Sequence, residues 1–169
     1  MKKIILVLAV LTTILSLYKK EKTVIPEESI RFRIIASSNL EKDQEIKKEI
    51  VKNIYPQLKT IKNFQTIEET RKYLIEELPT LEEIVDNTLK KNHLSNSFHI
   101  NYGKNFFPEK EYKEVTYPEG EYESLVITLG EGKGENFWCV LFPPICFMDE
   151  EEDIEYKSFF KEIIDKYFS

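Results

Sequence analysis

The stretch that most constrains the fold is residues 122–147, YESLVITLGEGKGENFWCVLFPPICF. In its first part Leu125, Ile127 and Leu129 fall on one face of a predicted strand, and the residues between them fall on the other face. The run from Phe137 to Phe142 is apolar on both faces, which is typical of a central strand buried on both sides. A short glycine-rich loop joins the two runs, so we predict an antiparallel hairpin.

The loop between these predicted strands has an unusual composition. Three of the five glycines of the chain stand at alternate positions in it, at 130, 132 and 134. Glycine permits backbone angles that other residues resist, so the loop is expected to follow an unusual backbone path. After it, Pro143 and Pro144 end the second strand, because proline cannot donate a hydrogen bond to a sheet ladder.

The first half of the chain predicts one strand and two helices. Residues 30–36, IRFRIIA, alternate as a strand does, with Arg31 and Arg33 on the face opposite Phe32. Asn39 is a plausible N-cap for the helix that follows.

Each predicted helix contains a proline. The first helix carries an apolar stripe from Ile46 to Ile61, and Pro56 predicts a kink or a break in it. The sequence TIEE at residues 66–69 predicts a capping box that opens the second helix. Pro79 predicts a kink or a split in that helix as well.

The second half predicts strands. Residues 98–102 alternate, and residues 111–116 form a further short strand before the turn into the hairpin. The acidic run 149–153 precedes a last helical stripe, where it complements the helix dipole; it lacks the spacing of an EF-hand calcium loop. We therefore predict an α+β fold for residues 24–169, one domain with a mostly antiparallel sheet of four or five strands and helices packed against it.

Residues 1–23 have the pattern of a targeting segment. Lys2 and Lys3 precede an uncharged, mostly apolar run over residues 4–18, which predicts a hydrophobic helix of signal-peptide or uncleaved-anchor type. This segment carries a net charge of +4, which leaves −10 on the remainder of a chain whose formal net charge is −6. An acidic body argues against a nucleic-acid partner, because phosphate binding needs clustered basic residues. The domain is expected outside the cytoplasm, secreted or anchored by residues 4–18.

The sequence GEGKGENFWCVLFPPICF resembles the signature of the stage II sporulation protein R family. Two tryptophans usually precede the first cysteine in that family; here Phe137 takes the first place and only Trp138 matches. The resemblance extends to Phe107–Pro108, Lys110, Tyr112 and the run from Pro118 to Glu123, and more weakly to residues 34–47.

The resemblance implies a signalling protein that is not an enzyme. It implies a chain that is made in the forespore and exported into the space between the two membranes. Its implied partner is a membrane-bound aspartic peptidase of the mother cell, which cleaves the sigma-E precursor once it is activated. A generic cell-envelope binding domain is the alternative function.

Candidate chemistry in the sequence is sparse. The loop GEGKGEN joins two predicted strands, whereas phosphate loops lead from a strand into a helix N-terminus. This difference argues against nucleotide binding by the loop. A thiol hydrolase would pair Cys139 or Cys146 with His93 or His99, but no motif connects them. The C-x6-C spacing is also wider than zinc sites use. We therefore predict no catalytic residue, no cofactor, no metal and no small-molecule substrate.

Two sites remain as expectations. An exported chain with two cysteines predicts a disulfide between Cys139 and Cys146, with two buried free thiols as the alternative. The loop residues and the adjacent tryptophan are expected to contact the peptidase, because small residues permit close approach and tryptophan is enriched in binding hot spots. They are Gly130, Glu131, Gly132, Lys133, Gly134, Glu135, Asn136 and Trp138.

Overall fold

The structure is a computed structural model that describes residues 23–24, 27–94, 97–112, 115–147 and 167. The predicted N-terminal helix over residues 4–18 and the predicted helix after residue 154 lie outside these residues, apart from Tyr167. Among the described residues, no helix is both long and apolar enough to cross a membrane.

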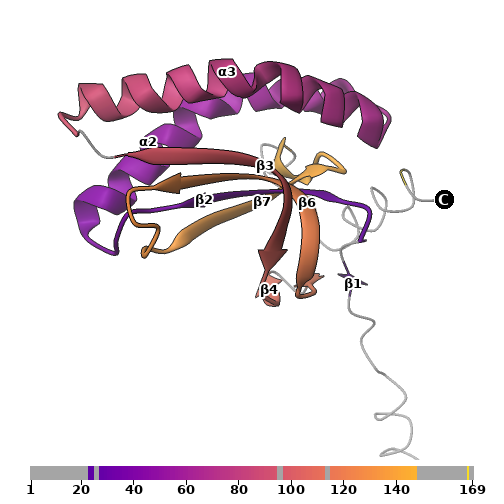
Figure 1. The fold of residues 1–169 in the computed structure, drawn as a ribbon. Coiled ribbons are helices and arrows are strands. Elements are labelled where there is room, and N and C mark those ends of the chain that lie inside the picture. Colours follow the sequence, from indigo (N-terminus) through magenta and orange to yellow (C-terminus); the bar gives the residue numbers. More distant parts are fainter. Residues whose placement is uncertain (1–22, 25–26, 95–96, 113–114, 148–166, 168–169) are drawn as a thin grey trace, which may run out of the picture.

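Two helices cover one face of a four-stranded sheet (Figure 1). Helix α2 spans Glu41–Leu58 and continues into the 3-10 helix η1, Lys59–Asn63. Helix α3 spans Ile67–Lys91. The apolar stripes of both helices pack on the same core, and the α+β class is confirmed.

The structure excludes the break predicted at Pro56 and the split predicted at Pro79. Helix α2 continues through Pro56 to Leu58, and α3 continues through Pro79 without a split. Each helix packs an apolar stripe that includes fully buried residues on the sheet, and this packing offsets the hydrogen bond that a proline removes. The capping box at Thr66 and Glu69 is confirmed, since each side chain accepts a bond from the other residue's backbone N–H.

The main sheet has the order β3-β6-β2-β7. These strands are β3 Phe98–Phe107, β6 Gly120–Leu129, β2 Ile30–Ile35 and β7 Asn136–Phe142. β3 is antiparallel to β6 and β7 is antiparallel to β2, but β2 is parallel to β6. The sheet is therefore mixed, and the prediction of a mostly antiparallel sheet is wrong in this respect.

The predicted hairpin of β6 and β7 is also wrong, because β2 lies between them. Arg33 of β2 pairs with Val126 of β6 on one side and with Trp138 of β7 on the other. The glycine loop thus bridges the end of β2 instead of making a tight turn between paired neighbours.

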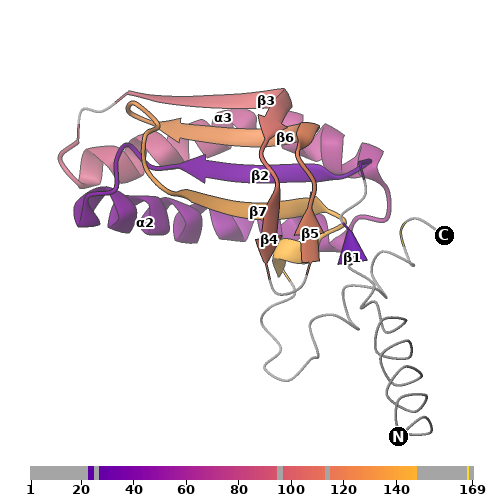
Figure 2. The same ribbon diagram turned by 90° about the horizontal axis from the view of Figure 1, so that it is seen from below.

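A small second sheet lies against the face of the main sheet that the helices leave open (Figure 2). Its order is β1-β5-β4, with β1 Thr23–Val24, β4 Lys110–Tyr112 and β5 Val115–Tyr117. The single strand predicted at 111–116 is wrong, because the described residues of this range belong to two antiparallel strands, β4 and β5. These two strands extend the β3–β6 pair and cross beneath β2 and β7.

The sheet has two differently packed faces. Phe32, Leu125 and Ile127 belong to the core beneath the helices, as the alternation of the sequence predicts. On the other face a second cluster forms around Phe107 and Tyr122.

Candidate partner-binding site

The glycine loop is fixed to the segment that follows β2. The backbone N–H of Lys133 donates to the carbonyl of Ser37 at 3.1 Å, and that of Gly134 donates to the carbonyl of Ala36 at 2.9 Å. The N–H of Glu135 donates to Oδ1 of Asn39 at 2.7 Å. Asn39 was predicted to cap α2, but the N-cap position belongs to Leu40 and the Asn39 side chain holds the loop instead.

A buried lysine completes this attachment. Nζ of Lys47, on α2, donates to the carbonyl of Glu135 at 2.8 Å and to Oε1 of Gln44 at 2.6 Å. Burial lowers the pKa of the Lys47 ammonium, and Glu135 partly opposes that effect. The loop is therefore tied both to the end of β2 and to α2.

Close packing explains the glycine pattern. A Cβ at Gly134 would lie 2.3 Å from the carbonyl oxygen of Ser38, and one at Gly130 would lie 2.4 Å from Oγ of Ser37. Gly130 and Gly132 also have φ angles of 52° and 63°, in the left-handed region that favours glycine. The glycines are thus required by the path of the loop over β2.

The side chains that the loop offers to a partner are charged. Glu131 and Lys133 have side chains 73% and 75% exposed, and they form an ion pair at 2.6 Å. Glu135 is exposed as well. The structure thereby separates the loop into a fixed backbone and three accessible charged groups.

Trp138 lies apart from these charges, on the face of β7 that points away from the helices. Its ring packs edge-on against Phe107, with centroids 5.3 Å apart, and the guanidinium carbon of Arg33 lies 5.4 Å from its centroid. Nζ of Lys110 lies 5.4 Å from the same centroid. Trp138 and Asn136 line a groove along β7, which Glu131, Lys133 and Glu135 do not line.

The groove has a volume of about 470 Å³. Five consecutive β7 residues, 136–140, form its floor. Val51 and Tyr55 of α2 form one wall, and Lys110 and Tyr117 of the small sheet form the opposite wall.

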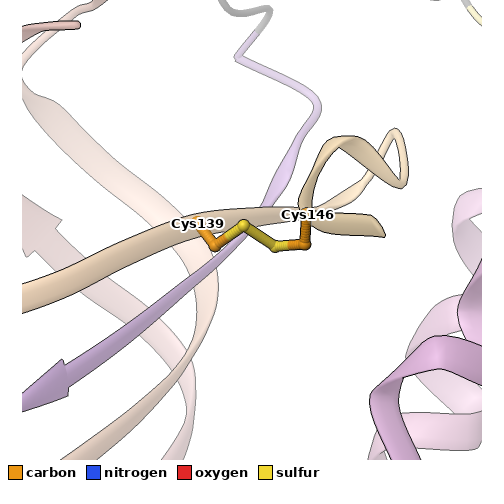
Figure 3. Close-up of a disulfide and its surroundings, with 2 residues drawn as sticks. All are labelled: Cys139 and Cys146. Atoms are coloured by element: carbon orange, nitrogen blue, oxygen red, sulfur yellow. A yellow bond between two sulfur atoms is a disulfide. The ribbon is translucent and has the colours of Figure 1, made fainter. Parts of the chain in front are cut away.

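The disulfide forms part of the lining of this groove. Cys139 on β7 and Cys146 on the 3-10 helix η2, Ile145–Phe147, are joined with their Cα atoms 5.6 Å apart (Figure 3). This separation lies in the range of roughly 4.4–6.8 Å that disulfides require. The bond holds η2 against β7, so that Ile145 and Cys146 belong to the groove lining.

Two arginines on β2 were not recognised as notable from the sequence. Arg31 is only 2% exposed, and its guanidinium lies among Phe107, Tyr117 and Tyr122. Burial lowers the pKa of both Arg31 and Arg33. The available signal was the alternation IRFRI, which places two charges on a strand that the sheet topology makes central.

The groups proposed for a thiol hydrolase are not assembled. The sulfur atoms of Cys139 and Cys146 are bonded to each other, so neither is a thiolate nucleophile. His99 lies exposed on β3, at the opposite edge of the sheet from β7, and His93 is exposed after α3.

Comparison with known proteins gives consistent matches. The family model for stage II sporulation protein R matches residues 26–152, more than half of the chain. The stage II sporulation protein R of Bacillus subtilis (strain 168) is 39% identical over 146 residues. That alignment covers 81% of this chain and 65% of the Bacillus protein, so the chain spans somewhat less than two thirds of the relative's length. No solved structure matches the chain significantly.

Proposed function

Because the chain belongs to the stage II sporulation protein R family and so has a role in sporulation, we propose that it is an exported signalling protein. In this proposal the forespore makes the chain, and residues 4–18 direct it across the forespore membrane. The domain from residue 24 onward then lies in the space between the two membranes. There it activates, by contact, the membrane-bound aspartic peptidase that processes the sigma-E precursor.

The observation that most supports activation by contact is the attachment of the glycine loop. Its backbone is held by Ala36, Ser37, Asn39 and Lys47. A loop that is ordered before it binds loses less conformational entropy on binding. The exposed charges of Glu131, Lys133 and Glu135 are therefore proposed as part of the surface that engages the peptidase.

The test is reconstitution in a non-sporulating host. The chain is co-expressed with the peptidase and the sigma-E precursor, and cleavage of the precursor is measured by immunoblotting. We expect cleavage only when both the chain and the peptidase are present. The variants Lys133→Glu, Glu131→Lys and Glu135→Lys are expected to reduce it, because they reverse exposed charges at the contact.

A matched control distinguishes contact from a general charge effect. Lys72→Glu reverses a charge on α3, where the side chain is 78% exposed, and is expected to leave cleavage unchanged. If the loop variants are folded and exported and still support normal cleavage, the loop is structural and the contact surface lies elsewhere.

Export is tested separately with a reporter that is active only in the cytoplasm. The reporter is fused to the C-terminus, and activity is expected only after deletion of residues 4–18. Strong activity of the full-length fusion would contradict the proposed orientation.

A further inference from the structure

The outer edge of β7 is not paired with any strand of the described residues. In the order β3-β6-β2-β7 this strand is the last, and within the described part of the chain it pairs only with β2. The groove touches five consecutive β7 residues, 136–140. Successive residues of a strand point to opposite faces, so a groove that touches all five follows the edge of the sheet and not one face.

The groove has side chains on both sides of the β7 edge, as binding of an added strand requires. Val51 and Tyr55 lie on the helix side, and Lys110 and Tyr117 lie on the side of the small sheet. An edge strand offers a row of backbone donors and acceptors, and recognition by strand addition combines these bonds with pockets for alternate side chains. Because β7 has seven residues, its edge is about 23 Å long at ~3.3 Å per residue.

Polar groups at the groove lack partners. Oδ1 of Asn136 is buried and accepts no hydrogen bond from any described residue. Nε of Arg33, beside Trp138, is likewise a buried donor with no acceptor in the described part of the chain. Buried polar atoms are almost always bonded. Because Asn136 lines the groove and Arg33 does not, only Oδ1 of Asn136 calls for a donor on a bound segment.

The charge at the groove is positive, although the chain as a whole is acidic. Nζ of Lys110 and the guanidinium carbon of Arg33 each lie 5.4 Å from the centroid of Trp138, and of the two only Lys110 lines the groove. Neither has a carboxylate within 4.0 Å among the described residues, whereas other cations of the domain, such as Arg71 and Lys91, do. The charge of Lys110 also contributes to lowering the pKa of the nearby Lys47. An acidic side chain on a bound segment would pair with Lys110, the only charged residue among those that line the groove.

We propose that the groove binds an extended acidic segment of a partner protein, which adds to β7 as a fifth strand of the main sheet. Apolar side chains of the segment face Val51 and the disulfide, and a carboxylate faces Lys110. The identification of that partner with the activated peptidase rests on the proposed function. The inference that the groove binds an acidic segment does not rest on it.

The direct test uses the intrinsic fluorescence of Trp138, the single tryptophan of the chain. The full-length protein is titrated with the peptide acetyl-Thr-Val-Glu-Val-Thr-Val-amide and with the same peptide carrying Lys in place of Glu. We expect a saturable change with the acidic peptide and binding at least about tenfold weaker with the basic one. Lys110→Glu is expected to remove this preference. Lys104→Glu, an exposed lysine on β3 at the opposite edge, is expected to retain it.

The processing assay provides the second measurement. We expect Lys110→Glu to reduce cleavage of the sigma-E precursor and Lys104→Glu to leave it unchanged. If neither peptide changes the fluorescence, or if both bind equally to the native protein, the groove proposal is overturned. Normal cleavage with a folded Lys110→Glu variant would exclude the groove as the peptidase site while the proposed function stands. If the acidic peptide binds selectively but the native chain never activates the peptidase, the proposed function fails and the acidic-segment site is supported.

Discussion

The guanidinium carbon of Arg31 lies 3.3 Å from the centroid of the Tyr122 ring, on the face of the sheet that the helices do not cover. Its Nη1 donates to the carbonyl of Pro118 at 3.3 Å, which connects the central strand to the turn before β6. Arg31 thus occupies the place of a core residue between the main sheet and the small sheet.

Because of this position, we expect the loss of stability on substituting Arg31 to depend on the size of the replacing side chain. Arg31→Ala removes the aromatic contacts and leaves a cavity, so we expect it to lower the free energy of unfolding by about 2–4 kcal/mol. Arg31→Met fills most of the space without a buried charge and is expected to cost about 1 kcal/mol or less. Urea denaturation followed by circular dichroism measures both values. An alanine variant as stable as the native protein would contradict a packing role.

The second prediction concerns Glu123, which connects α3 to the sheet. It accepts two hydrogen bonds of 2.8 Å from Arg71 and one from the hydroxyl of Tyr102. The bonds from Arg71, followed by that from Tyr102, hold the pKa of Glu123 below its usual value in spite of partial burial. Glu123→Gln is expected to lower the free energy of unfolding by about 1 kcal/mol at pH 7.

This effect has a definite pH dependence. Since the pKa of Glu123 is lower in the folded state, its contribution is complete above the unfolded value of about 4.3. It is lost as pH falls through the lower, folded value. The stabilities of the native protein and Glu123→Gln should therefore converge below about pH 4 in urea titrations from pH 7 to 3. Glu121→Gln, at an exposed position of the same strand, is the control and should show no such convergence.

The third prediction separates two glycines by their surroundings. Gly134→Ala places a methyl group 2.3 Å from the Ser38 carbonyl oxygen, and relief requires a backbone shift. We expect a loss of about 1–3 kcal/mol, as for other overpacked sites. At Gly103 an added Cβ meets no atom within 4 Å, so the φ angle of 159° is the remaining source of strain there, and Gly103→Ala should cost less stability than Gly134→Ala. Equal thermal stability of the two variants would exclude the packing explanation of the loop.

The fourth prediction concerns the bond between Cys139 and Cys146. Closing a loop of this length stabilises the fold by about 2.5 kcal/mol in the chain-entropy model. The double variant Cys139→Ser, Cys146→Ser is expected to lose about that amount. Thiol labelling of the unfolded, non-reduced protein after export provides the independent check. Two reactive thiols would show that the bond does not form in the exported chain.

Local patterns in the sequence predicted the elements and their faces well. The alternation around Leu125 identifies the side of β6 that packs under the helices, and the TIEE sequence identifies the start of α3. These predictions succeed because they depend on residues a few positions apart.

The order of the strands in the sheet could not be predicted from such local patterns. A loop of this length suits a hairpin, and it is the strand order, with bonds such as those between Gly134 and Ala36 and between Glu135 and Asn39, that shows that it crosses β2. Those contacts join segments about a hundred residues apart, and no local pattern encodes them. The groove was missed for the same reason, because its walls come from α2, the small sheet and β7.

The central position of β2 makes the binding surface depend on nearly the whole chain. Arg31 pairs with Val140 and Arg33 with Trp138, so β2, near the start of the domain, lacks one of its two neighbours until β7 has been synthesised. Before β7 is made, the end of β2 has no glycine loop crossing it, and the groove lacks the β7 residues that form its floor. A partner that recognises either feature would therefore bind only a chain that extends through β7. A product that ends before β7 would not activate that partner.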